Sequence, residues 1–174
     1  FFFFFFLSLI LTREKQFIDL LLVTPPSRLE VYQSLSSNFA AIEPPVWSGL
    51  IANFVRAKGF TVQILDAEAL GLTHQETASA IIEANAVLTT YVIYGQQPSA
   101  STQCMPGGRK VATIVNENSD LPSLVMGTHA SALPERTLTE EPYNFVCEGE
   151  GPRTVASLLD ALKENSQNLS KVPG

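Results

Sequence analysis

The chain has 174 residues, 45% of them hydrophobic, so it can bury a core of its own and is short enough to form one domain. Its 17 acidic residues outnumber its 11 basic ones, and a formal charge of -6 would repel the phosphate backbone of DNA or RNA. Composition therefore argues against a nucleic-acid partner.

Two cysteines, Cys104 and Cys147, lie far apart and match no metal-ligand spacing. A disulfide framework needs more cysteines in a shorter chain, so reduced thiols and a cytoplasmic location are expected. The apolar run at the N-terminus is shorter than the roughly 20 residues of a membrane span and lacks the flanks of a secretory signal. We therefore expect residues 1–16 to be an extension outside the fold, residues 17–164 to form the domain, residues 165–174 to be a polar tail, and no membrane to be a partner.

Strands and helices are expected to alternate along the chain. Residues 17–23 form an apolar run that ends at Pro25 and Pro26, and a polar loop follows over residues 27–38. A helix begins at Pro44 and ends at Gly59, with Trp47 expected in the core. Its core face is expected to consist of Val46, Leu50, Phe54 and Val55.

The second half of the chain repeats the pattern. Residues 60–65 alternate as a strand, and Thr73 with Glu76 forms the capping box of a helix. Further strands are expected at 86–94, 121–126 and 144–147, with helices at 103–115, 134–141 and 151–164. Right-handed crossovers then give a doubly wound, flavodoxin-like (Rossmann-like) α/β fold with a five-stranded parallel sheet and helices on both faces.

In such a sheet, ligands bind outside the carboxyl ends of the strands, so the loops after the strands are the candidate site. These loops are small, polar or rich in glycine, which suits close backbone approach and neutral hydrogen bonds to a large polar cofactor. The same residues also serve ordinary turns and helix caps. The candidate cofactor-binding residues are Pro25, Pro26, Gly95, Gln96, Ser99, Ser101, Thr102, Gly127, Thr128, His129, Ala130, Glu148, Gly149, Glu150 and Gly151.

No residue is assigned to catalysis or to metal binding. His129 has no second ligand at metal spacing, so it is interpreted as a hydrogen-bonded loop residue rather than a ligand or general base. Glu148 and Glu150 point opposite ways on an extended segment and precede a helix, which favours a structural role. Cys104 has no base beside it in sequence, and phosphate-loop, dinucleotide and nucleophile-elbow motifs are missing.

The residues that carry a resemblance are the Pro-Pro strand end, the WSGL sequence at Trp47, the GTHASALPE sequence at Gly127 and the CEGEG sequence at Cys147. Over about residues 17–162 the chain resembles the cobalamin-binding domain of cobalamin-dependent radical S-adenosylmethionine (SAM) enzymes. The resemblance implies a corrin ring across the strand-end loops and a methyltransferase-like parent enzyme. It implies base-off cobalamin without a protein His ligand, because the DxHxxG motif of other cobalamin proteins is missing here.

In that family a separate catalytic domain carries a CxxxCxxC motif for a [4Fe–4S] cluster and binds SAM, and the two cysteines here cannot supply it. The resemblance therefore implies a radical SAM domain as partner, in cis or in trans. A bulky side chain at Gly127 or Gly149 is expected to abolish cobalamin binding and leave the fold intact. Two alternatives stay open: a flavodoxin-like interaction or signalling domain without cofactor, and an enzyme for a flavin or sugar nucleotide.

Overall fold

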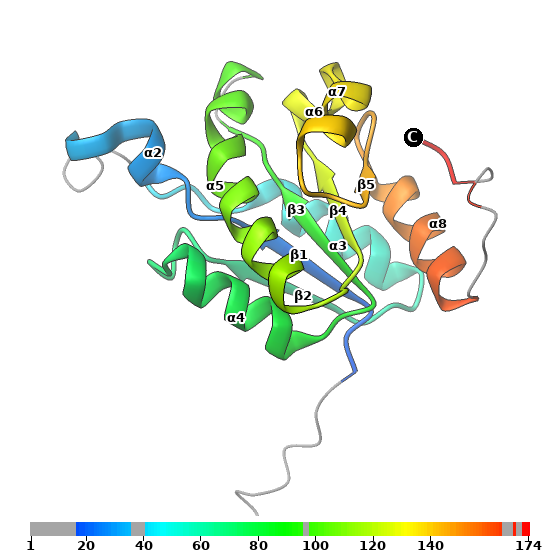
Figure 1. The fold of residues 1–174 in the computed structure, drawn as a ribbon. Coiled ribbons are helices and arrows are strands. Elements are labelled where there is room, and N and C mark those ends of the chain that lie inside the picture. The colour runs from blue at the N-terminus through cyan, green and yellow to red at the C-terminus, as the bar shows by residue number, and fades with distance from the viewer. Residues whose placement is uncertain (1–16, 36–40, 96–97, 165–168, 170–171) are drawn as a thin grey trace, which may run out of the picture.

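The computed structural model describes residues 17–35, 41–95, 98–164, 169 and 172–174. Five parallel strands form one sheet in the order β2-β1-β3-β4-β5, which confirms the doubly wound, flavodoxin-like fold (Figure 1). The strands are β1 (Leu20–Thr24), β2 (Val62–Asp66), β3 (Leu88–Val92), β4 (Ser123–Met126) and β5 (Phe145–Val146). The helices are α2 (Arg28–Tyr32), η1 (Gln33–Leu35), α3 (Val46–Ala57), α4 (His74–Ala84), α5 (Pro98–Asn118), α6 (Thr128–Ala132), α7 (Pro134–Glu140) and α8 (Pro152–Lys163).

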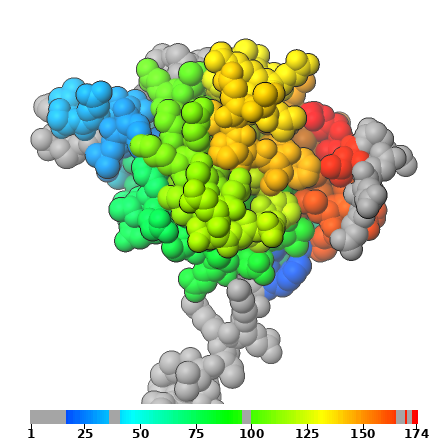
Figure 2. All heavy atoms as spheres, viewed as in Figure 1, coloured from blue at the N-terminus to red at the C-terminus, as the bar shows by residue number. Residues whose placement is uncertain are grey.

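Alternate residues of β1 enter two separate hydrophobic clusters, because successive side chains of a strand point to opposite faces. Leu21 and Val23 join the cluster that includes residues of α4 and α5, the two helices over the face seen in Figures 1 and 2. Leu20 and Leu22 join the cluster that includes residues of α3 and α8 on the other face. Burial on both faces explains why β1 is a continuous apolar run.

Helix α5 runs unbroken through Pro106, Gly107 and Gly108, although proline and glycine are the poorest helix formers. Both glycines are buried at close contacts. A Cβ at Gly107 would collide with the carbonyl oxygen of Pro26, and one at Gly108 would lie 2.5 Å from Ile93 Cδ1. Tertiary packing against the loop after β1 and against β3 therefore requires these residues and outweighs their low helix propensity.

The core face of α3 differs from the sequence prediction. Val55 is buried as expected, but Val46 and Leu50 are 58% and 57% exposed. The helix packs on the sheet through a neighbouring stripe of Ser48, Ile51, Ala52 and Val55. Two apolar stripes overlap in this sequence, and the one with small side chains allows the closer approach to the sheet.

Two short helical segments replace expected loops. Helices α2 and η1 occupy the first part of the polar loop after β1, and α6 occupies the loop after β4. The capping box at the start of α4 is confirmed, since Thr73 Oγ1 accepts a hydrogen bond from Glu76 N and the Glu76 carboxylate accepts one from Thr73 N. The expected extension over residues 1–16 and most of the expected tail lie outside the described residues.

Candidate functional site

The carboxyl ends of β1 and β3 form the switch point of the sheet. These strands are neighbours, yet the chain leaves β1 towards β2 on one side and leaves β3 towards β4 on the other. The connections diverge above this point and leave a crevice, which is where open α/β sheets bind ligands. Thr24 ends β1 here, and the exposed Gly95 follows β3.

A pocket of about 230 Å³ lies at this crevice, between the strand ends and the start of α3. It is smaller than the roughly 300–1,000 Å³ of sites that enclose a drug-sized ligand, so it would hold part of a larger molecule. Its lining is neutral apart from one carboxylate. The lining residues are Thr24, Glu43, Pro44, Pro45, Val46, Trp47, Ser48, Val92, Tyr94 and Gly95.

An aromatic pair stands at one side of this pocket. Trp47 and Tyr94 are stacked with ring centroids 4.7 Å apart and an angle of 19° between the rings. Trp47 is 42% exposed, so its expected place in the core is wrong. Burial raises the pKa of Tyr94, and the charges of Cys147 and Glu150 raise it further, so its hydroxyl stays protonated and able to donate.

Ser48 also lines the pocket. Its side chain is 1% exposed, and its hydroxyl has no hydrogen-bond partner among the described residues. Each buried hydroxyl without a partner costs about 1–3 kcal/mol of desolvation free energy. Ser48 is the one member of this group that lines the pocket; the other such hydroxyls among the described residues belong to Thr89, Thr90, Tyr91, Thr137 and Tyr143. A ligand with a polar group in this pocket would supply the missing partner.

The loops after β3 and β4 are joined by the hydroxyl of Ser101. This hydroxyl donates to the carbonyl oxygen of Ile93 at 2.5 Å and accepts from His129 N at 3.1 Å. Thr102 Oγ1 lies 2.9 Å from His129 Nδ1 in a second hydrogen bond between the same two segments. The structure thus brings together the predicted residues Ser101, Thr102 and His129. Both hydrogen bonds of the Ser101 hydroxyl are made within the protein.

Gly127 has a different role from the one expected. Its φ is +148°, and an added Cβ would collide with the carbonyl oxygen of Ile93 and lie 3.0 Å from Ser101 Oγ. A bulky side chain at Gly127 would therefore disturb the contact between the ends of β3 and β4. We therefore expect a bulky side chain at Gly127 to destabilise the fold, in contrast to the expectation from the sequence that it would leave the fold intact.

The loop after β5 is mostly exposed. Glu148, Gly149 and Glu150 are exposed, and Gly149 N donates to Ser131 Oγ at 2.7 Å. Gly151 is buried, with a φ of +86°, and an added Cβ would collide with Met126 Cε. The positive φ favours glycine at both Gly149 and Gly151, and a Cβ at Gly151 would also require the end of the Met126 side chain to move, whereas one at Gly149 would meet open space.

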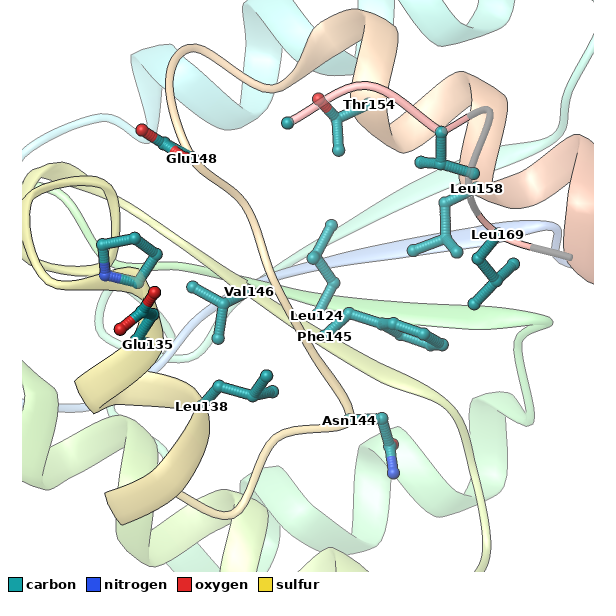
Figure 3. Close-up of a pocket in the computed structure, with 13 residues that line it drawn as sticks. Leu124, Glu135, Leu138, Asn144, Phe145, Val146, Glu148, Thr154, Leu158 and Leu169 are labelled. Carbon is teal, nitrogen blue, oxygen red and sulfur yellow. The ribbon is translucent and has the colours of Figure 1, made fainter.

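A second pocket, of about 390 Å³, lies at the β5 edge of the sheet. Figure 3 shows Glu135 and Leu138 of α7 on one side of it and Leu158 of α8 with Leu169 on the other. Glu148 also lines this pocket, and it is not among the residues that line the pocket at the switch point.

The loop after β1 is held by ion pairs and hydrogen bonds. One carboxylate oxygen of Glu68 accepts from Ser27 N and Arg28 N at 2.7 and 2.9 Å. Glu30 Oε1 lies 2.8 Å from Lys110 Nζ on α5 and 3.1 Å from His74 Nε2 on α4. Burial raises the pKa of Glu30, but its hydrogen bonds, the one from Lys110 foremost, lower it by more, so Glu30 is ionised.

The remaining predicted residues lie at the same edge of the sheet, apart from those that the structure does not describe. Pro25 is buried, Pro26 contacts α5, Thr128 begins α6 and Ala130 is buried. Gln96 and the side chain of Ser99 lie outside the described residues. Sequence reasoning missed Trp47, Ser48 and Tyr94. The signal that could have found Trp47 and Ser48 is Pro44-Pro45, which marks the start of the helix between β1 and β2. That helix must begin at the carboxyl edge of the sheet, so its first residues lie beside the site.

Among the described residues, no group of three or more His, Cys, Asp or Glu side chains is placed to hold a metal ion. Within the same residues, no helix combines the length and the apolar character needed to cross a membrane. His129 interacts through Nδ1 with Thr102, in agreement with its interpretation as a hydrogen-bonded residue.

The chain matches the B12 binding domain family over residues 33–159. No curated protein matches it. It is similar to a solved structure of the radical S-adenosylmethionine methyltransferase TsrM from Kitasatospora setae with tryptophan substrate and a SAM analogue, with 18% identity, a TM-score of 0.64, and coverage of 89% of this chain and 27% of that chain. TsrM with cobalamin and a [4Fe-4S] cluster bound gives 16% identity, a TM-score of 0.64, and coverage of 90% and 26%.

A third similar structure is that of apo OxsB, a cobalamin-dependent S-adenosylmethionine radical enzyme. It has 17% identity and a TM-score of 0.59, and the match covers 92% of this chain and 20% of that chain. The chain thus spans about a quarter or less of the length of these proteins, and the likeness concerns the fold. Because the family match takes in α3, the loops after β3 and β4 and the start of α8, this chain belongs to the B12-binding domain family.

Proposed function

We propose that this chain binds cobalamin at the carboxyl edge of its sheet, as the carrier module of a methyltransferase-like radical SAM enzyme. The observation that carries the proposal is the pocket at the switch point, where the buried hydroxyl of Ser48 has no partner among the described residues. The family match and the fold shared with TsrM and OxsB support the same conclusion.

The residues at this edge suit cobalamin in their chemistry, and the pocket would hold part of the molecule. The corrin ring carries amide side chains, which pair with neutral groups such as the hydroxyls of Ser48 and Tyr94. Gly95 is exposed and lines the pocket, so its backbone can contact the ring, while the side on which a Cβ would stand is taken by Ala100 of α5. The stacked rings of Trp47 and Tyr94 offer an aromatic wall to an apolar part of the ligand.

When bound, cobalamin supplies a cobalt centre that can accept a methyl group and pass it on. The residues of this chain would hold and orient it. We propose the candidate residues of the loops after β1, β3, β4 and β5 as contacts, together with Trp47, Ser48 and Tyr94. We propose the base-off form without a protein ligand to cobalt, because the loop after β1 lacks the DxHxxG motif whose histidine binds cobalt in other cobalamin proteins.

The radical chemistry is proposed to reside outside this chain. A radical SAM domain, in cis or in trans, would carry the [4Fe–4S] cluster and SAM, as TsrM carries a cluster and is named a methyltransferase. We place the complex in the cytoplasm, without nucleic-acid or membrane partners, from the acidic composition and the two free thiols.

The test is a titration of the purified chain with cobalamin, followed by gel filtration and absorbance spectra, with flavin mononucleotide as the control ligand. We expect cobalamin to co-elute with the protein, with its absorbance bands at the wavelengths of the base-off form, and we expect flavin not to be retained. A folded protein that stays colourless would overturn the proposal and favour an interaction domain. Retention of the flavin alone would favour the flavin enzyme instead.

A further inference from the structure

The exposed face of α3 changes character halfway along the helix. In the first half, the apolar side chains of Val46, Trp47 and Leu50 are 58%, 42% and 57% exposed, and Gly49 between them is also exposed. In the second half, the exposed positions include the polar side chains of Asn53 and Arg56. Single exposed apolar residues are ordinary, but three within one and a half turns, without a charge among them, form a patch.

This apolar half is the half next to the candidate cofactor site. Helix α3 leads from β1 back to the start of the parallel strand β2, so its first turn stands at the carboxyl edge of the sheet. Val46 and Trp47 line the pocket together with Thr24 and Gly95. Ile42, which is 48% exposed, precedes the helix at the same end. We call Ile42, Val46, Trp47 and Leu50 the α3 patch.

Resting on the function proposed above, we propose that the α3 patch is the docking surface for the radical SAM catalytic domain. A catalytic domain must reach the cobalt from the open side of the strand ends, and its surface then lies beside the patch. The chain spans about a quarter or less of TsrM and OxsB, which leaves most of such a protein to make this contact.

The composition of the patch defines the surface that fits it. An interface core is depleted in charge and enriched in aromatic side chains, as the patch is around Trp47. The matching surface of the catalytic domain is therefore apolar, and the contact would exclude water from the side of the pocket formed by the start of α3. The polar second half of α3 stays in solvent.

The test places the photo-crosslinker p-benzoylphenylalanine at Leu50, which does not line the pocket, and at the exposed Ala57 of the same helix as a matched control. The gene is expressed as its whole reading frame together with its neighbouring frames, and cross-linked peptides are sequenced. We expect position 50, and not position 57, to cross-link to a segment of a polypeptide that carries a CxxxCxxC motif. No cross-link at position 50, equal cross-linking at both, or a cross-link to a second copy of the chain or to a protein without that motif would overturn the proposal.

A second variant separates this inference from the proposed function. Leu50→Glu should weaken the complex with the cross-linked partner by about tenfold or more, because a buried charge is added to an apolar contact. Its affinity for cobalamin should change by less than about twofold, because Leu50 lies outside the pocket. If cobalamin binds but Leu50→Glu leaves the complex unchanged, only the docking surface is wrong. If the unaltered chain does not retain cobalamin, the proposed function is wrong and this inference falls with it.

Discussion

Replacement of Ser48 by alanine should make the free chain more stable and its cobalamin complex weaker. The hydroxyl is buried and has no partner among the described residues, so its desolvation costs about 1–3 kcal/mol that no hydrogen bond offsets. Removing it should raise the free energy of unfolding by about 1 kcal/mol, at the lower end of that range, because the missing oxygen leaves a small void.

The same substitution removes the group that we expect to pair with cobalamin. A neutral hydrogen bond contributes about 0.5–1.5 kcal/mol, which corresponds to a rise in Kd of roughly two- to tenfold. The two effects have opposite signs, so they cannot both come from general damage to the fold. Urea unfolding of the free chain gives the first quantity, and cobalamin titration gives the second.

Ser123→Ala is the matched control. Ser123 is equally buried, but its Oγ lies 2.9 Å from Asn144 Oδ1 and accepts a hydrogen bond from Asn144 N, and it sits at the start of β4, away from the carboxyl edge. This variant should lose about 1 kcal/mol of stability and bind cobalamin normally. The reasoning is refuted if Ser48→Ala destabilises the free chain as Ser123→Ala does, or if it leaves the Kd for cobalamin unchanged.

Three further outcomes are expected. Gly149→Ala should cost about 1–2 kcal/mol through its φ of +92° alone, and Gly127→Ala should cost more because its Cβ would also collide with Ile93; equal losses in urea unfolding would contradict this. The side chain of Asp19 is 5% exposed, and burial raises its pKa, but hydrogen bonds from Lys163 and Thr61 lower the pKa by more, to below the ordinary 3.8. The ionised Asp19 therefore stabilises the fold above about pH 3.8, and this contribution is lost as the pH falls through the lowered pKa. Asp19→Asn should lose about 1.5 kcal/mol at pH 7 and show a flatter loss of stability below about pH 4, in unfolding curves measured across that range. Burial raises the pKa of the Cys104 and Cys147 thiols, so both should react with iodoacetamide at pH 7.5 far more slowly than after unfolding, and fast labelling of the native chain would contradict their placement.

The strand and helix alternation was readable from the sequence because the buried strands are short runs of apolar and β-branched residues between helix signals, and β1 is a continuous apolar run. Leu20 to Val23 faces helices on both sides, and Thr73 with Glu76 marks a helix start through a local hydrogen-bond pair. Both signals depend on neighbouring residues only. The packing surface of α3 could not be read in the same way, because Val46 and Leu50 repeat at helical spacing as regularly as Ser48, Ala52 and Val55 do.

The sequence places the candidate site at the carboxyl edge of the sheet, where the switch-point pocket lies, but sequence reasoning did not find Ser48 and Tyr94, which line that pocket. Loop positions were chosen for glycine and small polar side chains, and this finds Gly95 and Gly127. Ser48 was overlooked because an ordinary serine in a helix becomes unusual only when the sheet buries it without a partner. Tyr94 is a candidate contact because its ring stacks on that of Trp47, which lies 47 positions earlier in the sequence. No local sequence pattern reveals such a contact.

Pro106 gives α5 a mechanical property of its own. Proline has no N–H, so the helical bond to the carbonyl of Thr102 cannot form, and the ring presses on that carbonyl. The first two turns carry Ser101 and Thr102, which are hydrogen-bonded to Ile93 and His129, and bury Met105 in the core; the later turns bury Val111, Ala112 and Val115 in the same core cluster. The missing hydrogen bond therefore lies beside Met105, Gly107 and Gly108, which pack against the core and the loop after β1, so a bend of α5 at this point would move the loops after β3 and β4 relative to the sheet.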